Sequence, residues 1–219
     1  MLGYNGFVLQ RERKDDQESL AIVYTASYHK IPLKVVSNYK EVSSNWIPVG
    51  TIEWISKILG RTVVPNYYPD FLKEYFNRNI WKTDEWPLGK KVFIKPADKD
   101  KRFKARITNR GYSGKKKPPY WCSDIVHFDN EWRYYVANGE VLTGEWYMGD
   151  EIACPYAPLF NITFPRGFCG AVDMGTVNDK LTLVEVNHPF SCGWYGKNHE
   201  LYARWIVEGW ESLRQFTVF

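Results

Sequence analysis

The segment 168–196, FCGAVDMGTVNDKLTLVEVNHPFSCGWYG, constrains the fold most strongly because it predicts a β-hairpin with two different faces. Two runs rich in β-branched residues flank the turn-forming Asn178 and Asp179. A three-residue loop at 178–180 would set Asp173 opposite Glu185. The hairpin therefore brings two carboxylates together from separate strands.

Side chains alternate along a strand, so Asn187 is expected on the same face as Asp173 and Glu185. The opposite face is apolar and is expected to enter a core through Val172, Met174, Val184 and Val186. A hard cation such as Mg²⁺ takes oxygen ligands at about 2.1 Å and usually shares them with substrate phosphates. We therefore predict that Asp173, Glu185 and Asn187 are metal ligands, with a solvated acidic strand face as the alternative.

Composition narrows the class of protein. The chain has 219 residues, which is room for one large domain or two small ones with a shared interface. Its net charge of +4 suits a phosphate-bearing ligand without requiring nucleic acid. The four cysteines lack the C-x-x-C spacing of a zinc site.

The N-terminal sequence MLGYNGFVLQRERKDDQE has neither the basic nor the apolar region of a signal peptide. No apolar run approaches the ~18 residues that a membrane span needs. We therefore expect no membrane partner and a reducing cytoplasmic location, in the host cytoplasm if the chain is viral.

Residues 1–86 predict a small α/β lobe on the substrate side. Strand-like runs at 6–10, 19–25 and 30–36 precede a helix at 52–59 whose apolar residues recur at helical spacing up to Gly60. A second helix is expected from Asp70 to Arg78. A shift in composition at 86–89, WPLG, places a soft boundary before the remaining region, 87–219.

The second region begins with a strand at 91–96 that ends in Lys95-Pro96 and is followed by a basic loop. Ten Lys or Arg residues fall between Lys95 and Lys117. Such a loop can be a solvated surface, a nucleic-acid contact or a cover over phosphates, and sequence alone favours the surface.

Further strands are predicted at 120–128 and on both sides of Asn138-Gly139, a strong hairpin-turn signal. Alternation places Glu131, Arg133 and Tyr135 on one face and Trp132, Tyr134 and Val136 on the other. A loop at 148–167 follows, and the segment 199–216 predicts a C-terminal helix that packs against the sheet.

Four motifs now stand in order along the chain: FIKP ending near Lys95, SDIV at 123–126, E-x-R at 131–133, and Asp173 followed by E-V-N at 185–187. This order resembles the ATP-grasp superfamily, within it the small viral and bacterial ATP-grasp proteins related to RimK-type ligases. The N-terminal PVG and PNYYP motifs also resemble that clade. The resemblance implies an α/β (α+β) fold in which two lobes with antiparallel sheets grip ATP, preceded by the N-terminal lobe.

The resemblance also implies roles for individual residues. Lys95 and Lys101 would contact the phosphates of ATP, and Arg133 would bind a phosphoryl group or a substrate carboxylate. The backbone at Cys122, Ser123 and Asp124 would bind adenine. Ile125 would pack on the ring and Leu183, expected on the face of Glu185, would form an apolar floor beneath it.

The implied activity is that of an ATP- and Mg²⁺-dependent carboxylate-amine ligase. It would form an acylphosphate, release ADP and act on a small-molecule, amino-acid or peptide substrate. This chain departs from the pattern in its phosphate-covering loop, which is longer and more basic than a compact glycine-rich loop.

Three other functions stay open from the residues alone. The basic loop at 99–117 could make the chain a nucleic-acid-binding module, and nucleic acid is the less favoured partner. A nucleotidyltransferase with Lys95 as nucleophile lacks its K-x-D-G context. A nucleotide-binding domain without chemistry is the third. Neither the substrates nor the oligomeric state is indicated.

Overall fold

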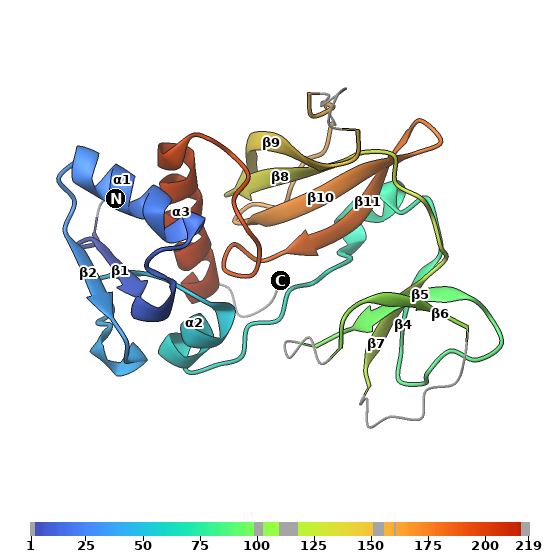
Figure 1. The fold of residues 1–219 in the computed structure, drawn as a ribbon, viewed down its shortest axis with the longest axis horizontal. Coiled ribbons are helices and arrows are strands. Elements are labelled where there is room, and N and C mark those ends of the chain that lie inside the picture. The colour runs from blue at the N-terminus through green and yellow to red at the C-terminus, as the bar shows by residue number, and fades with distance from the viewer. Residues whose placement is uncertain (1–2, 99–102, 110–117, 151–155, 160, 216–219) are drawn as a thin grey trace.

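The computed structural model describes residues 3–98, 103–109, 118–150, 156–159 and 161–215. Its strands form three sheets, each in a different part of the molecule (Figure 1). Lys101, predicted to contact phosphate, and much of the basic loop lie outside the described residues.

The N-terminal lobe is built on a parallel sheet in the order β2-β1-β3. β1 spans Phe7–Gln10, β2 spans Leu33–Val36 and β3 spans Ile47–Val49. The helices α1, Gln17–Tyr28, and α2, Ile52–Leu59, complete the lobe, together with the short 3₁₀ helices η1, Arg11–Arg13, and η2, Tyr39–Glu41. This confirms the predicted mixture of strands and helix.

The prediction of a strand at 19–25 was wrong, because this run lies inside α1. The Asp16 side chain caps the helix by accepting a hydrogen bond from Ser19 N at 2.8 Å. The buried residues follow helical spacing: Ala21, Ile22, Thr25 and Ala26. The β-branched residues are thus tolerated because packing of this face outweighs their strand preference.

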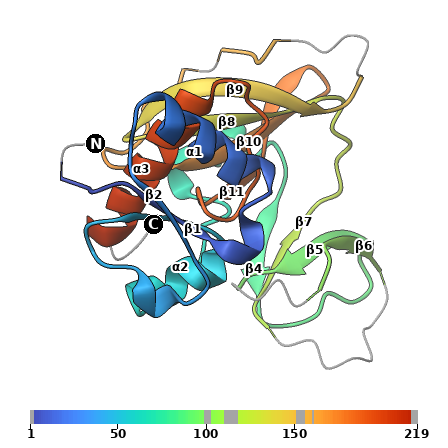
Figure 2. The ribbon, with the colours of Figure 1, turned by 60° about the vertical axis from the view of Figure 1, so that its left-hand side comes forward.

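The central sheet is antiparallel, in the order β11-β10-β8-β9. Its strands are β8, Glu131–Ala137; β9, Glu140–Met148; β10, Gly170–Val177; and β11, Lys180–Asn187. The helix α3, His199–Gln215, lies between this sheet and the N-terminal lobe and contacts both (Figures 1 and 2). The predicted C-terminal helix and its packing are confirmed.

The third sheet has the order β4-β7-β5-β6 and lies apart from the N-terminal lobe (Figure 1). Its strands are β4, Ile80–Thr83; β5, Val92–Pro96; β6, Arg106–Thr108; and β7, Tyr120–Ser123. Because β4 pairs with β7, this sheet begins before the boundary expected at residue 86. The division into 1–86 and 87–219 stays a prediction.

Two further predicted elements differ from those observed. The helix expected from Asp70 to Arg78 is the 3₁₀ helix η3, Asp70–Tyr75. The strand expected at 120–128 ends at Ser123, where the chain leaves the sheet. Asp124 N still donates to Asn79 O at 3.0 Å, so the chain stays close to the start of β4.

The β10–β11 hairpin has a two-residue turn, since Val177 pairs with Lys180. Asn178 and Asp179 have positive φ values of 49° and 60°, as a tight hairpin turn requires. A β-bulge then leaves Val184 unpaired, so Met174 pairs with Leu183 but Asp173 pairs with Glu185. The predicted Asp173–Glu185 pairing is confirmed, although the predicted three-residue loop was wrong.

The face of the central sheet that is turned away from α3 is apolar. Trp132, Tyr134 and Val136 lie here as predicted, packed with η3 and with residues of the hairpin: Val172, Met174, Leu183 and Val186. The Asn138-Gly139 turn joins β8 to β9 as expected. The described part of 148–167 beyond β9 contains no helix or strand.

Searched over the described residues, none of the helices combines the length and apolarity that spanning a bilayer requires.

We predict that Met174→Ala lowers the free energy of unfolding by about 2–5 kcal/mol, because it leaves a cavity in a fully buried cluster. Urea denaturation measures the change. Val141→Ala on β9, where the side chain is 40% exposed, is the control and should change stability by about 0.5 kcal/mol or less. Equal effects of the two substitutions would contradict the observed core.

Candidate functional site

The candidate site lies between the central sheet and the β4–β7 sheet. A cavity of about 230 Å³ opens there, and both sheets contribute to its wall. The lining residues are Tyr68, Arg78, Phe93, Ile107, Ser123, Asp124, Ile125, Val126, Phe128, Glu131, Val184 and Glu185. Side chains predicted from separate motifs therefore meet in one place.

Asp173 and Arg133 form a buried, bidentate ion pair across neighbouring strands. Arg133 Nε donates to Asp173 Oδ1 at 2.7 Å, and Nη2 donates to Oδ2 at 2.8 Å. The two residues are only 2% and 8% exposed. Burial raises the pKa of Asp173 while Arg133 opposes that rise. The pair matches two rigid strand positions, since Asp173 stands opposite Arg133 in the sheet.

Lys95 reaches from β5 to the central sheet and forms an ion pair with Glu185. Its ammonium also lies 3.8 Å from the centre of the Tyr67 ring and 4.7 Å from that of Tyr68. Burial, followed by the charge of Glu185, raises the pKa of the Tyr67 hydroxyl to about 12. The two sheets are thus connected by a charge contact at the edge of the cavity.

Asn187 joins the two carboxylates. Its amide Nδ2 donates to Glu185 Oε1 at 2.7 Å and to Asp173 Oδ2 at 3.3 Å. The structure therefore brings together all three predicted metal ligands, with Lys95 and Arg133 beside them.

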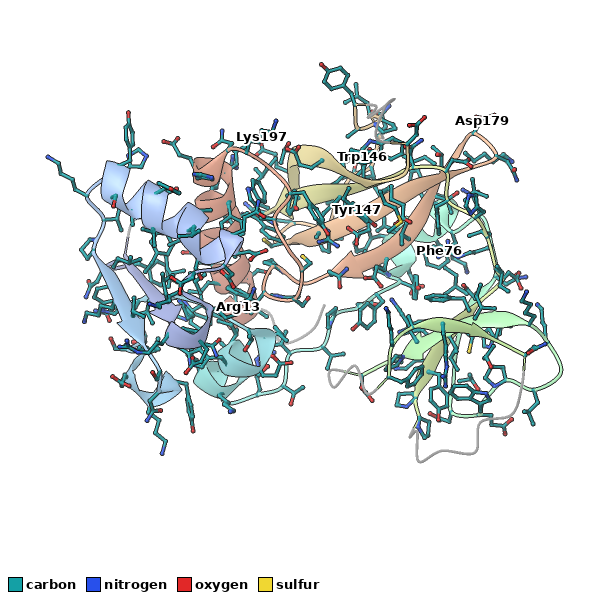
Figure 3. The ribbon with its side chains drawn as sticks, viewed as in Figure 1. Arg13, Phe76, Trp146, Tyr147, Asp179 and Lys197 are labelled. Atoms are coloured by element: carbon teal, nitrogen blue, oxygen red, sulfur yellow. The ribbon has the colours of Figure 1, made fainter. Side chains whose placement is uncertain are left out.

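Glu131 and Tyr147 extend this polar cluster towards β9. The Tyr147 hydroxyl donates to Glu131 Oε2. Burial raises the pKa of Glu131, although the bond from Tyr147 opposes the rise. Tyr147, labelled in Figure 3, comes from β9, so three adjacent strands supply the cluster.

Two stacked tyrosines enclose one side of Arg133. The rings of Tyr147 and Tyr195 are nearly parallel, with centres 5.2 Å apart, and the guanidinium carbon lies 5.4 Å and 5.1 Å from them. Arg133 Nη1 also donates to Gly193 O at 3.2 Å. Since Tyr195 is 46% exposed, this side of the cluster borders solvent.

The segment after β7 forms the wall predicted to hold adenine. Ser123, Asp124 and Ile125 line the cavity. The side chain of Cys122 is on the other face of the sheet, packed with Ile94, so only its backbone is available. Lys90 is bonded to Asp124 at 2.7 Å and lowers the pKa of that carboxyl.

The bulge corrects two predicted positions. Leu183, expected on the face of Glu185, is fully buried in the apolar cluster with Met174. Val184, expected in the core, lines the cavity next to Glu185. The extra residue shifts the alternation by one position, so Val184 takes the place predicted for Leu183.

The donor set fits Mg²⁺ that is shared with phosphate better than Mg²⁺ alone. Within the part of the chain that the structure describes, no three His, Cys, Asp or Glu side chains gather closely enough to hold a metal ion. Asp173, Glu185 and the amide of Asn187 do converge, and Mg²⁺ is commonly bound by one or two carboxylates plus substrate phosphates.

Sequence reasoning missed four residues of the site: Tyr67, Arg78, Tyr147 and Val184. Tyr147 follows from the hairpin, because inward positions on β9 face those on β8. Tyr67 and Arg78 reach the site through loops whose course has no sequence periodicity. The bulge that exposes Val184 likewise left no local signal.

Comparisons with known proteins were consistent in fold. The model of an ATP-grasp domain family, described as family 2 of its clade, matches residues 73–205. No curated protein matches the chain.

Three solved structures illustrate the likeness. The ATP-grasp ligase PsnB with its minimal precursor has a TM-score of 0.52 at 9% identity and covers 94% of this chain and 99% of its own. D-alanine–D-alanine ligase from Bacillus anthracis with ATP has a TM-score of 0.52 at 10% identity and covers 98% of both chains. PsnB with its precursor, Mg and ADP has a TM-score of 0.50 at 8% identity and covers 95% and 99%. At such identities the likeness concerns the fold alone.

We predict that Asp173→Asn lowers the free energy of unfolding by about 3–5 kcal/mol, because it leaves the buried Arg133 without its countercharge. Chemical denaturation measures the loss. Glu140→Gln breaks an exposed pair with Arg204 and should cost about 1 kcal/mol or less. Similar small losses in both variants would show that the buried pair is not formed.

Proposed function

Because this chain belongs to the ATP-grasp family, we propose that it is an ATP- and Mg²⁺-dependent ligase that joins a carboxylate to an amine. The observation that carries the proposal is the convergence of Lys95 from one sheet with Asp173, Glu185 and Asn187 from another. The proposal also draws on the cavity beside them.

The cavity wall is suited to a flat base. Ile125, Val126, Phe93 and Val184 supply apolar contacts, and Ser123 and Asp124 belong to a segment that has left its sheet. In our proposal the adenine ring lies here, with its polar edge facing the main chain from Cys122 to Asp124. Leu183 supports this wall from behind and does not touch the base.

Lys95 is placed for the phosphates at the polar end of the cavity. In the structure its charge is balanced by Glu185, so binding of ATP exchanges that carboxylate for a phosphate oxygen. Asp173, Glu185 and Asn187 are then the groups that hold Mg²⁺, which neutralises phosphate charge during transfer. Lys101 remains in the proposal as a second phosphate contact.

Arg133 is the group proposed to bind the reacting carboxylate or the phosphoryl group. A carboxylate oxygen of the substrate attacks the γ-phosphorus of ATP, which forms an acylphosphate and releases ADP. An amine nitrogen then attacks the acyl carbon and expels phosphate, with loss of the amine proton. Arg133 stabilises negative charge in both steps through its fixed guanidinium.

An amino acid or peptide is the proposed substrate class. Of the similar structures, PsnB is described with a precursor peptide, and the Bacillus anthracis enzyme ligates D-alanine to D-alanine. Proximity and charge stabilisation suffice for this chemistry, so neither a cysteine nucleophile nor a catalytic triad is required.

The test is a screen of amino acids and peptides for ADP formation that depends on Mg²⁺. We predict that Glu185→Gln lowers the rate by about 10²-fold or more, because the site loses a charged ligand next to the phosphates. Glu140→Gln, the same chemical change on an exposed residue, should keep wild-type activity. Glu185 serves better than Asp173, whose substitution also removes the countercharge of Arg133.

Full activity of Glu185→Gln would contradict the assignment of the metal site. If instead the chain bound oligonucleotides with steep salt dependence and Glu185→Gln left that binding unchanged, the nucleic-acid function would replace the proposed one.

A further inference from the structure

Arg78 makes an unusual set of contacts at the hairpin. Its guanidinium donates to three main-chain carbonyl oxygens: Leu183 O at 2.6 Å, Phe76 O at 3.2 Å and Val184 O at 3.3 Å. Two of these carbonyls belong to the bulge. Arg78 is half-buried and lies in the wall of the cavity beside Phe128, at 5.5 Å from the ring centre.

The bulge decides which way Glu185 points. Without it, the pairing that runs from the turn to Met174–Leu183 would continue and set Val184 opposite Asp173. Glu185 would then stand opposite Val172, whose side chain is in the apolar core. The extra residue restores Glu185 and Asn187 to the face of Asp173.

A bulge disrupts the local ladder and needs other partners for its main-chain groups. β11 is the outermost strand of its sheet, so carbonyls that point outward have no neighbouring strand. Arg78 supplies donors for two consecutive carbonyls at this point. A guanidinium can do so because its several N–H groups have a fixed planar arrangement, whereas an ammonium is a single point of charge.

We propose that Arg78 is a positioning residue that holds the β11 bulge and thereby fixes Glu185 towards the metal and Lys95; this rests on the proposed function. The segment 76–79 also joins the two halves of the site. Phe76 lies between the central sheet and the β4–β7 sheet (Figure 3), and β4 starts at Ile80. Arg78 thus ties the strand bearing Glu185 to the sheet bearing Lys95.

The neighbouring Asn77 provides a matched control. Its Nδ2 donates to Leu181 O at 2.9 Å and to Thr182 Oγ1 at 3.0 Å, just before the bulge. Asn77 has a φ of 44°, which glycine adopts freely. Asn77→Gly therefore removes a side-chain contact to the same strand without straining the backbone or touching the bulge.

The experiment measures binding of Mn²⁺, as a stand-in for Mg²⁺, to the ADP-bound protein by calorimetry. We predict that Arg78→Met weakens Mn²⁺ binding by about 10–100-fold, the loss typical of groups that orient metal ligands. Arg78→Lys should recover part of this affinity, and Asn77→Gly should change it by about twofold or less. Thermal unfolding of each variant verifies that it is folded.

A second measurement separates positioning from direct contact with the nucleotide, because Arg78 also lines the cavity. Binding of ADP without metal should stay close to wild type in Arg78→Met. An equal loss of metal-free ADP binding would overturn the inference, as would wild-type Mn²⁺ affinity in Arg78→Met. If the wild-type protein bound neither Mn²⁺ nor ADP, the proposed function itself would fail, and the inference with it.

Discussion

The site depends on one irregularity in the backbone, the bulge at Val184. β-Strands place alternate side chains on opposite faces, so a single extra residue decides which face every later side chain occupies. Before the bulge, β11 contributes Leu183 to the core; after it, the strand contributes Glu185 and Asn187 to the polar cluster. The two-residue turn fixes the register, and the bulge converts that register into a site.

The charges of the site are arranged in two pairs that differ in what they can release. Arg133 and Asp173 are nearly fully buried and bonded at two points, which makes their separation costly. Lys95 and Glu185 meet at the edge of the cavity, where the Glu185 side chain is 29% exposed. The first pair therefore acts as a rigid frame, while the second can exchange its partners for a phosphate and a metal ion.

Much of the fold could be predicted from sequence because its strongest patterns are local. Alternation along β8, the Asn138-Gly139 turn and the helical spacing up to Gly60 are all confirmed. The resemblance to ATP-grasp proteins is confirmed by the family match, and the predicted fold class by the mixed helices and antiparallel sheets. The strand predicted at 19–25 failed because tertiary packing of one helical face overrides local preference.

The candidate site was predictable where motifs carry charge on regular strands. Lys95, Arg133, Asp173, Glu185 and Asn187 do converge, although their roles stay predictions. Side-chain placement around the bulge was not predictable, since its cause is a contact from Arg78, over a hundred positions away in the sequence. Tyr67 likewise meets Lys95 only through the path of a loop.

A crystal structure with a non-hydrolysable ATP analogue and Mg²⁺ tests the central claim most directly. The account predicts adenine against Ser123–Val126, Lys95 moved from Glu185 to a phosphate, and a metal ion at about 2.1 Å from oxygens of Glu185 and its neighbours Asp173 or Asn187. A nucleotide bound elsewhere, with the Lys95–Glu185 pair intact, would contradict it.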